Sequence, residues 1–159
     1  MLSNSMKLNY ILIPIAVFLT ALIGSSLTDP NSTWYKTLKL PSFAPPGYVI
    51  GMVWTIIFIL CAISAIIIWN KLPHNNLFWW VIAIFVINAL LNIGWSLLFF
   101  NQHQILASLA EMLFLEISVI LLIVLSWKGA QIAAYLLFPY AAWVLFATYL
   151  TYNIYQLNK

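Results

Sequence analysis

Residues 77–100 read LFWWVIAIFVINALLNIGWSLLFF, an apolar run that carries three regularly spaced polar residues, Asn88, Asn92 and Ser96. Each helical step of four residues advances about 40° beyond a full turn, so the three side chains share one helix face. A run of this length and polarity is typical of a membrane-spanning helix, in which carboxamides are not expected to face lipid. We therefore predict that this polar stripe faces a protein interior, where a ligand, another helix or trapped water satisfies it.

The composition of the whole chain is that of a membrane protein. Of its 159 residues, 65% are hydrophobic and 6% are charged, whereas about a quarter of the residues of a soluble domain are charged. The long apolar runs exclude a transmembrane β-barrel, whose strands are about ten residues long and alternate in polarity. We expect an all-α membrane protein with a single domain over residues 1–159.

Five apolar runs are each long enough to span a hydrocarbon core of about 30 Å. They are residues 9–27, 49–69, 77–100, 105–127 and 132–155. Short connectors join the last four runs and should make consecutive helices antiparallel neighbours, which predicts an up-down bundle of five transmembrane helices. The first run also resembles a signal peptide, because Lys7 precedes it and small residues follow it. It is longer than a usual signal core, so we expect it to be the first span.

The charged residues indicate interfacial anchoring rather than a charged ligand. All six basic residues are lysines, three residues are acidic, and the net charge is +3. Lysines near the helix ends are ordinary membrane anchors, and this pattern does not favour nucleic-acid binding. The lysines divide equally between the two sides of the bundle, which leaves the orientation open. Without a transit peptide in the sequence, we expect a multi-pass protein of the bacterial inner membrane.

The segment between the first two runs, residues 28–47, differs from the short connectors. Pro41, Pro45 and Pro46 oppose a regular helix through it. Its aromatic and aliphatic residues make it too apolar for a free linker, and long irregular segments in compact domains are usually lids or binding loops. We predict a structured loop that caps a pocket at one mouth of the bundle; alternatively, Trp34 and Tyr35 only anchor it at the membrane interface.

Two further runs each present one face of aromatic and small residues. These faces are formed by Trp54, Phe58, Cys61 and Ala65 in the second run and by Pro139, Tyr140, Trp143, Ala147 and Leu150 in the fifth. Packing between helices explains such faces, since small residues permit close approach. Carboxamides opposite an aromatic wall would instead make a ligand pocket. The residues alone leave both interpretations open.

Other chemistry has little support in the sequence. Glu111 and Glu116 lie in the fourth run but point about 140° apart, which argues against an acid pair. His74 and His103 fall in separate connectors, and no cluster has metal-ligand spacing, so no metal site is expected. No nucleophile–base motif, phosphate loop or dinucleotide fingerprint is present. We expect no hydrolytic enzyme.

Three motifs resemble those of the TspO/MBR family, whose members are called tryptophan-rich sensory protein, translocator protein or peripheral-type benzodiazepine receptor. The first motif is Trp34-Tyr35-x-x-Leu38-x-x-Pro41-Ser42-Phe43-x-Pro45-Pro46 followed by Gly51-x-x-Trp54. The second is Asn88-x-x-x-Asn92-x-x-Trp95-Ser96-x-x-Phe99-Phe100, and the third is Pro139-Tyr140-x-x-Trp143-x-x-Phe146-Ala147-Thr148-Tyr149-Leu150. Together they cover nearly the whole chain.

The resemblance implies a five-helix bundle, commonly a homodimer, with a pocket under the first loop and no required cofactor. It implies binding of porphyrins such as protoporphyrin IX or haem and of benzodiazepine-site ligands. Trp54 and Trp143 match pocket tryptophans linked to light-dependent porphyrin breakdown in some bacterial members. The other residues that match pocket positions are Tyr35, Pro45, Ile50, Phe58, Asn88, Asn92, Ala147 and Leu150, and Ser96 joins them from the polar stripe.

The chain departs from the family pattern at several positions. Phe43 replaces a frequent tryptophan, and Leu40 stands where a basic residue is common. The steroid-recognition segment usually has arginine at the position of Gln156, which weakens the expectation of cholesterol binding.

The expected function is that of a membrane tetrapyrrole receptor or carrier. Because some family members support light-dependent porphyrin breakdown, the question whether this protein is an enzyme stays open. Two alternatives remain. One is a transmembrane transporter of porphyrin or of lipid or cholesterol, and the other is a sensory or scaffold protein that signals through partners.

Overall fold

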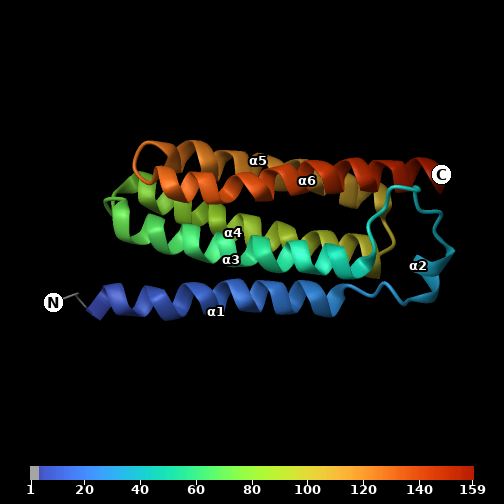
Figure 1. The fold of residues 1–159 in the computed structure, drawn as a ribbon, viewed down its shortest axis with the longest axis horizontal. Coiled ribbons are helices and arrows are strands. Elements are labelled where there is room, and N and C mark those ends of the chain that lie inside the picture. Colours follow the sequence, from blue (N-terminus) through green and yellow to red (C-terminus); the bar gives the residue numbers. More distant parts are fainter. Residues whose placement is uncertain (1–3) are drawn as a thin grey trace.

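The computed structural model describes residues 4–159, which form helices and connecting segments without a β-strand in this range. The elements are α1 (Asn4–Leu27), α2 (Thr33–Thr37), α3 (Gly47–Lys71), α4 (Asn76–Ser96), the π-helical turn η1 (Leu97–Asn101), α5 (Ile105–Trp127) and α6 (Gln131–Leu157). Five helices of the described chain are long and apolar enough to cross a membrane. The predicted all-α bundle is thereby confirmed, and Figure 1 shows its long helices side by side.

The long helices form a closed ring that does not follow their order in the sequence. Helix α3 packs against α6, α6 against α5, α5 against α4, and α1 against both α3 and α4. Consecutive helices α3 and α4 share few close contacts and meet near their connector, where the ring of Trp69 lies edge-on to Phe78 at 5.2 Å. Such a ring can surround a space along its axis.

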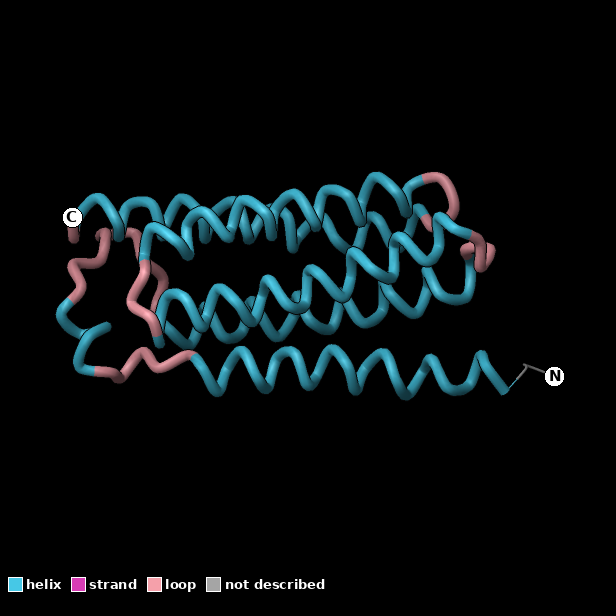
Figure 2. The backbone as a smooth tube through the Cα atoms, turned by 180° about the vertical axis from the view of Figure 1, so that it is seen from behind, coloured by secondary structure: helices cyan, strands magenta, loops and turns pink. Residues whose placement is uncertain are grey.

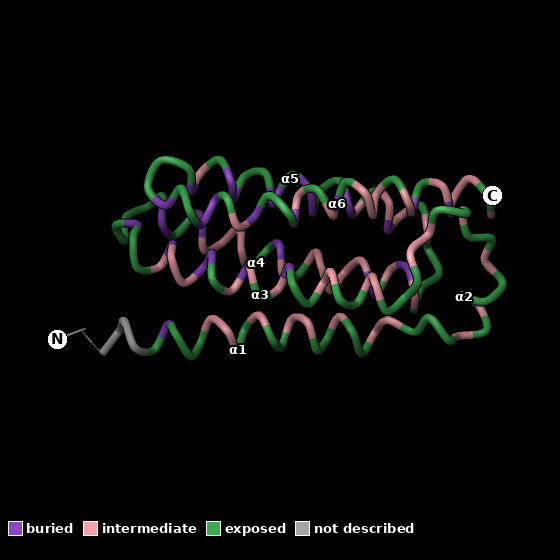
Figure 3. The backbone as a smooth tube through the Cα atoms, viewed as in Figure 1, coloured by how far each residue is buried: buried purple, intermediate pink, exposed green. Residues whose placement is uncertain are grey.

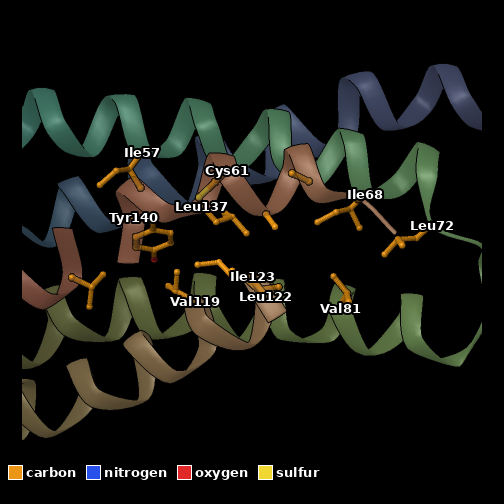
Figure 4. Close-up of a cluster of buried hydrophobic side chains, with 14 of the residues drawn as sticks. Ile57, Cys61, Ile68, Leu72, Val81, Val119, Leu122, Ile123, Leu137 and Tyr140 are labelled. Carbon is orange, nitrogen blue, oxygen red and sulfur yellow. The ribbon is translucent and has the colours of Figure 1, made fainter. Parts of the chain in front are cut away.

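The half of the ring next to the α3–α4 and α5–α6 connectors is solid. Ile68, Val81 and Leu137 are fully buried there, and Figure 4 shows side chains from α3, α5 and α6 meeting in this core. Gly129 leaves room for a neighbouring side chain, because a Cβ at this position would collide with Leu72. This half is therefore a close-packed core that supports the other end of the bundle.

Helix α1 is the least buried of the five spans, as Figure 3 shows. At one end, Asn9 Nδ2 donates to Asn70 Oδ1 at 2.9 Å, and Asn70 Nδ2 donates to the Tyr10 hydroxyl at 3.0 Å. At the other end, the hydroxyls of Thr28 and Ser96 are 3.2 Å apart. Hydrogen bonds thus attach α1 near its two ends, while its middle packs on α3 and α4 through apolar contacts.

The segment from α1 to α3 is structured and lies at one end of the bundle (Figures 1 and 2). It includes α2, whose N-cap Ser32 accepts a hydrogen bond from the Tyr35 amide at 3.2 Å. The ring of Phe43 stacks on Tyr149 of α6 at 5.4 Å. The backbone N–H and C=O of Lys39 both pair with the side chain of Asn158, at 2.9 and 3.0 Å. These contacts fix the loop against α6; that the loop closes a ligand pocket stays a prediction.

Candidate ligand cavity

A cavity of about 590 Å³ lies inside the helix ring, in the half next to the α1–α3 loop. All five long helices line it, and the loop contributes Pro30 and Tyr35. The lining comes from the last turns of α1, α4 and η1, the first half of α3 and α5, and the second half of α6. Alternating helix direction brings these segments to the same level. The volume falls within the ~300–1,000 Å³ typical of small-molecule sites.

Aromatic rings form much of the cavity wall. Trp54 and Phe58 of α3 lie 5.7 Å apart with a 32° angle between their planes. Trp143 and Phe146 of α6 lie 5.3 Å apart at 35°. On the α4 side, Trp95 stacks on Phe99 at 5.1 Å and 16°. This wall offers flat apolar surfaces from three helices to a planar guest.

No charged side chain is among the described residues that line the cavity. Its polar groups are instead neutral: the amide of Asn92, the hydroxyls of residues such as Thr28 and Ser96, and the indoles of the three lining tryptophans. The Nε1 atoms of Trp95 and Trp143 are buried without a hydrogen-bond partner in the described structure. The cavity therefore favours an uncharged, largely apolar guest that can accept hydrogen bonds from indole N–H groups.

A buried polar network lies beside the cavity and connects three helices. Asn92 Nδ2 donates to the Tyr140 hydroxyl at 2.9 Å, which donates to Asn88 Oδ1 at 3.1 Å. Asn88 Nδ2 donates to Ser118 Oγ at 2.8 Å. Of these four residues only Asn92 lines the cavity, so the network fixes one of its polar groups from outside.

The polar stripe runs into a π-helical turn, η1, directly after Ser96. The extra residue per turn changes the direction of the side chains that follow, and such turns often occur at functional sites. It places Phe99 in a buried position where Trp34 meets it edge-on at 5.5 Å. Tyr35 lies 5.4 Å from Phe100, and both line the cavity. The turn thus joins the α1–α3 loop to the cavity wall.

Partial burial raises the pKa of the Tyr35 phenol above its ordinary value. Because phenols already titrate near pH 10, Tyr35 stays neutral at physiological pH. It therefore adds a hydroxyl and no charge to the cavity lining.

Most of the predicted site residues meet at this cavity. Those that line it are Tyr35, Ile50, Trp54, Phe58, Asn92, Ser96, Trp143, Ala147 and Leu150. Pro45 lies outside the lining, in the loop before α3. Asn88 is also outside it, because its amide is used between Ser118 and Tyr140.

Sequence reasoning did not identify some residues that shape the site. Ser118 is one of several polar residues in the apolar run of α5, and only its distance from the amide of Asn88 reveals its role. The indole of Trp95 belongs to the second motif, but the stripe spacing did not select it. Glu111 and Glu116 do not line the cavity, although both carboxylate oxygens of Glu111 are buried without a partner in the described structure.

The fold and the cavity define a class: a multi-pass helical membrane protein with an uncharged internal cavity at one end of its bundle. The sequence profile of the TspO/MBR family matches residues 10–157. The chain belongs to the TspO/MBR family. This finding confirms the resemblance that the three motifs indicated.

Relatives come from several groups of organisms. The chain is 36% identical to the tryptophan-rich protein TspO of Bacillus cereus over 136 residues, covering 86% of this chain and 88% of the relative. It is 38% identical to TspO of Archaeoglobus fulgidus over 148 residues, covering 91% and 93%. It is 29% identical to the human translocator protein over 126 residues, covering 79% and 75%. The bacterial relatives are consistent with a location in the inner membrane.

Proposed function

We propose that the protein is a membrane receptor or carrier for a flat tetrapyrrole such as protoporphyrin IX or haem. One observation carries the proposal: an uncharged cavity of about 590 Å³ whose walls are aromatic rings on three helices. Planar apolar ligands gain affinity in such a site from apolar burial and offset stacking. Membership of a family that includes proteins named translocator protein supports a small hydrophobic ligand.

The macrocycle would lie between the rings of α3 and those of α6. Trp54, Phe58 and Trp143 supply the stacking surfaces in this pose. The remaining proposed contacts are Tyr35, Pro45, Ile50, Ser96, Ala147 and Leu150, with Asn92 as the amide contact and Asn88 acting through Tyr140.

Porphyrin carboxylates need a different environment from the macrocycle. The described cavity lining has no cation to pair with them, and burying an unpaired carboxylate is costly. We place the carboxylates at the loop end, near Lys36 of α2 and Lys39, which are exposed. Ion pairs at exposed sites contribute about 0–1 kcal/mol, so they would orient the ligand more than they bind it.

The tryptophans also support a photochemical role. Light absorbed by a bound porphyrin can remove an electron from a neighbouring indole, which gives a porphyrin radical anion and a tryptophan radical cation. Trp54 and Trp143 both line the cavity and are the proposed donors. Breakdown of the reduced macrocycle would then require dioxygen as co-reactant. This chemistry needs neither a general base nor a nucleophile.

Protoporphyrin IX titration in lipid nanodiscs tests the binding proposal through quenching of tryptophan fluorescence. Trp54→Phe and Trp143→Phe together should remove much of the quenching that is specific to the cavity. Trp79→Phe with Trp80→Phe is the matched control, since both indoles are exposed near the opposite end of the bundle. Equal effects of the two double variants, or no saturable quenching, would contradict tetrapyrrole binding in this cavity.

Three properties of the family extend the proposal. Benzodiazepine-site ligands would occupy the same aromatic cavity and compete with protoporphyrin IX. Cholesterol binding is not expected, because Gln156 stands at the usual arginine position. The protein would form a homodimer, which mass measurement of nanodisc particles can test.

A transporter is the second candidate function, favoured by the packing of α1. This helix contributes Phe18, Ala21 and Leu22 to the cavity wall, yet it is the least buried span of the bundle. Displacement of α1 would open the cavity to lipid and allow a ligand to pass into or out of the bilayer. Protein-dependent flux of protoporphyrin IX into sealed liposomes would support transport; binding without flux would favour a receptor.

A further inference from the structure

We propose that Tyr140 is a positioning residue that fixes the Asn92 amide so that its oxygen is presented to the cavity. Tyr140 is 3% exposed and does not line the cavity, so it acts through Asn92. The inference rests on the proposed function and specifies the ligand chemistry: a planar apolar molecule with an N–H or O–H donor directed at Asn92.

The direction of the hydrogen-bond chain is set at a backbone carbonyl. Ser118 Oγ lies 2.6 Å from Leu115 O, one turn earlier in α5. A carbonyl oxygen only accepts, so the single proton of Ser118 lies in this bond. Ser118 Oγ can then only accept from Asn88, whose nearer amide atom, at 2.8 Å, must be the donor Nδ2. The single proton of Ser118 thus determines the orientation of the Asn88 amide.

The Tyr140 hydroxyl passes this orientation from Asn88 to Asn92. With Asn88 Nδ2 directed at Ser118, Asn88 Oδ1 faces the Tyr140 hydroxyl at 3.1 Å and takes its only proton. The amide atom of Asn92 that lies 2.9 Å from the Tyr140 oxygen must therefore be Nδ2. A reversed Asn92 would place two oxygens in contact without a proton between them, so the chain excludes that orientation.

The free end of the chain is the carbonyl oxygen of Asn92. Oδ1 of Asn92 accepts no hydrogen bond from any described residue and is not among the buried side-chain atoms that lack a partner, so it is accessible, and Asn92 lines the cavity. The unpartnered indole N–H groups of Trp95 and Trp143 offer the opposite polarity at other points of the lining. The cavity thus has an acceptor at Asn92 and donors at the indoles, which fits a guest with both kinds of group.

A matched pair of rigid probes can test the orientation of Asn92. Carbazole and 9-fluorenone are planar three-ring molecules of similar size; carbazole carries an N–H donor and fluorenone a C=O acceptor. Their affinities are measured in lipid nanodiscs and corrected for partition into empty nanodiscs. The Asn92→Leu substitution is made in the wild-type and Tyr140→Phe backgrounds. In each background we compare the loss of affinity that Asn92→Leu causes for carbazole with the loss that it causes for fluorenone, and this probe difference reports the orientation of the amide. Tyr152→Phe, the same change at an exposed position of α6, is the control.

In the wild-type background, Asn92→Leu should weaken carbazole about tenfold, the effect of roughly 1.4 kcal/mol, and leave fluorenone within about twofold. In the Tyr140→Phe background the Asn92 amide is free to turn either way. Asn92→Leu should then reduce the affinities of the two probes by comparable factors. Tyr152→Phe should reproduce the wild-type difference. If Tyr140 had a purely structural role, Tyr140→Phe would change the affinities of both probes by the same factor, and the probe difference caused by Asn92→Leu would stay as in the wild type.

The outcomes separate this inference from the proposed function. Binding of both probes with equal sensitivity to Asn92→Leu in the wild type would overturn the fixed orientation alone. A difference that survives Tyr140→Phe would overturn the role of Tyr140. Failure of both probes and of protoporphyrin IX to bind would overturn ligand binding in the cavity itself. Ser118 also lies outside the cavity lining, and Ser118→Ala should reduce the difference between the two probes as Tyr140→Phe does.

Discussion

The indole of Trp34 and the imidazole of His103 stack face to face, with ring centres 4.2 Å apart and planes 15° from parallel. Trp34 belongs to α2 in the α1–α3 loop, and His103 to the connector between η1 and α5. The stack therefore joins the loop to the turn that follows the polar stripe. Since Tyr35 lines the cavity next to Trp34, this contact couples the loop position to the cavity wall.

Trp34→Ala should loosen the loop without unfolding the bundle. It removes the stack on His103 and the edge contact with Phe99, each of which is worth about 0.5–1.5 kcal/mol. Hydrogen exchange of residues 33–38 should become faster, and bound protoporphyrin IX should dissociate about tenfold faster. Trp80→Ala, which removes an exposed indole far from the loop, should change neither rate. An unchanged dissociation rate in Trp34→Ala would show that the loop does not retain the ligand.

A second prediction concerns the backbone conformation at His103. Its φ of 56° is in the left-handed region, which asparagine and histidine tolerate and β-branched residues do not. His103→Asn should lose only the ring stack, whereas His103→Val should also carry backbone strain of about 1–2 kcal/mol. Thermal unfolding in detergent should therefore rank wild type above Asn and Asn above Val. Equal unfolding temperatures of the two variants would mean that this φ carries no strain.

The sequence predicted the spans because apolar length and composition determine them locally. Its prediction that short connectors make consecutive helices neighbours is wrong for α3 and α4, since the order around the ring depends on which faces fit together across the bundle. The polar stripe correctly placed Asn88, Asn92 and Ser96 toward the interior. Spacing did not separate their roles, because Asn88 pairs with Ser118, a residue 30 positions away in the chain.

The π-helical turn η1 was a further feature beyond sequence reasoning. Residues 97–101 read LLFFN and continue the apolar run without a proline or glycine that would mark a change of geometry. The turn is defined by local backbone hydrogen bonds, such as that from the Gln102 amide to Leu97 O at 3.0 Å, and only the aromatic packing of Trp34 on Phe99 is tertiary. The sequence motifs identified most of the aromatic residues of the site, but their arrangement around the cavity could be seen only in the folded structure.

Gly129 tests the solid half of the bundle. A Cβ at this position would collide with the end of the Leu72 side chain, which must turn away, so Gly129→Ala should destabilise the protein by about 1 kcal/mol, at the low end of overpacking. Leu72→Ala combined with Gly129→Ala should regain part of this loss, because the smaller side chain makes room. Gly94→Ala in α4 is the control: nothing described lies within 4 Å of its added Cβ. There the substitution should be neutral or stabilising, by up to about 1 kcal/mol. Denaturation in detergent measures all three variants.

We expect the hydrogen bonds at the two ends of α1 to differ in their effect on ligand access. Asn70→Leu removes the partner of the buried Asn9 amide and of the Tyr10 hydroxyl, at the end of α1 away from the cavity. A buried amide without a partner costs about 1–3 kcal/mol, so the α1 amides near Tyr10 should exchange faster with deuterium. Thr28→Val removes the hydroxyl contact with Ser96 at the cavity end.

Because Thr28 and Ser96 line the cavity, only Thr28→Val should change the association rate of protoporphyrin IX strongly. If α1 admits ligand by moving at its cavity end, Thr28→Val should raise this rate several-fold, whereas Asn70→Leu should raise exchange in α1 and leave the rate within about twofold. Stopped-flow quenching and exchange mass spectrometry on the same nanodisc samples give both quantities. A larger rate increase in Asn70→Leu than in Thr28→Val would place the moving end of α1 on the other side of the bundle.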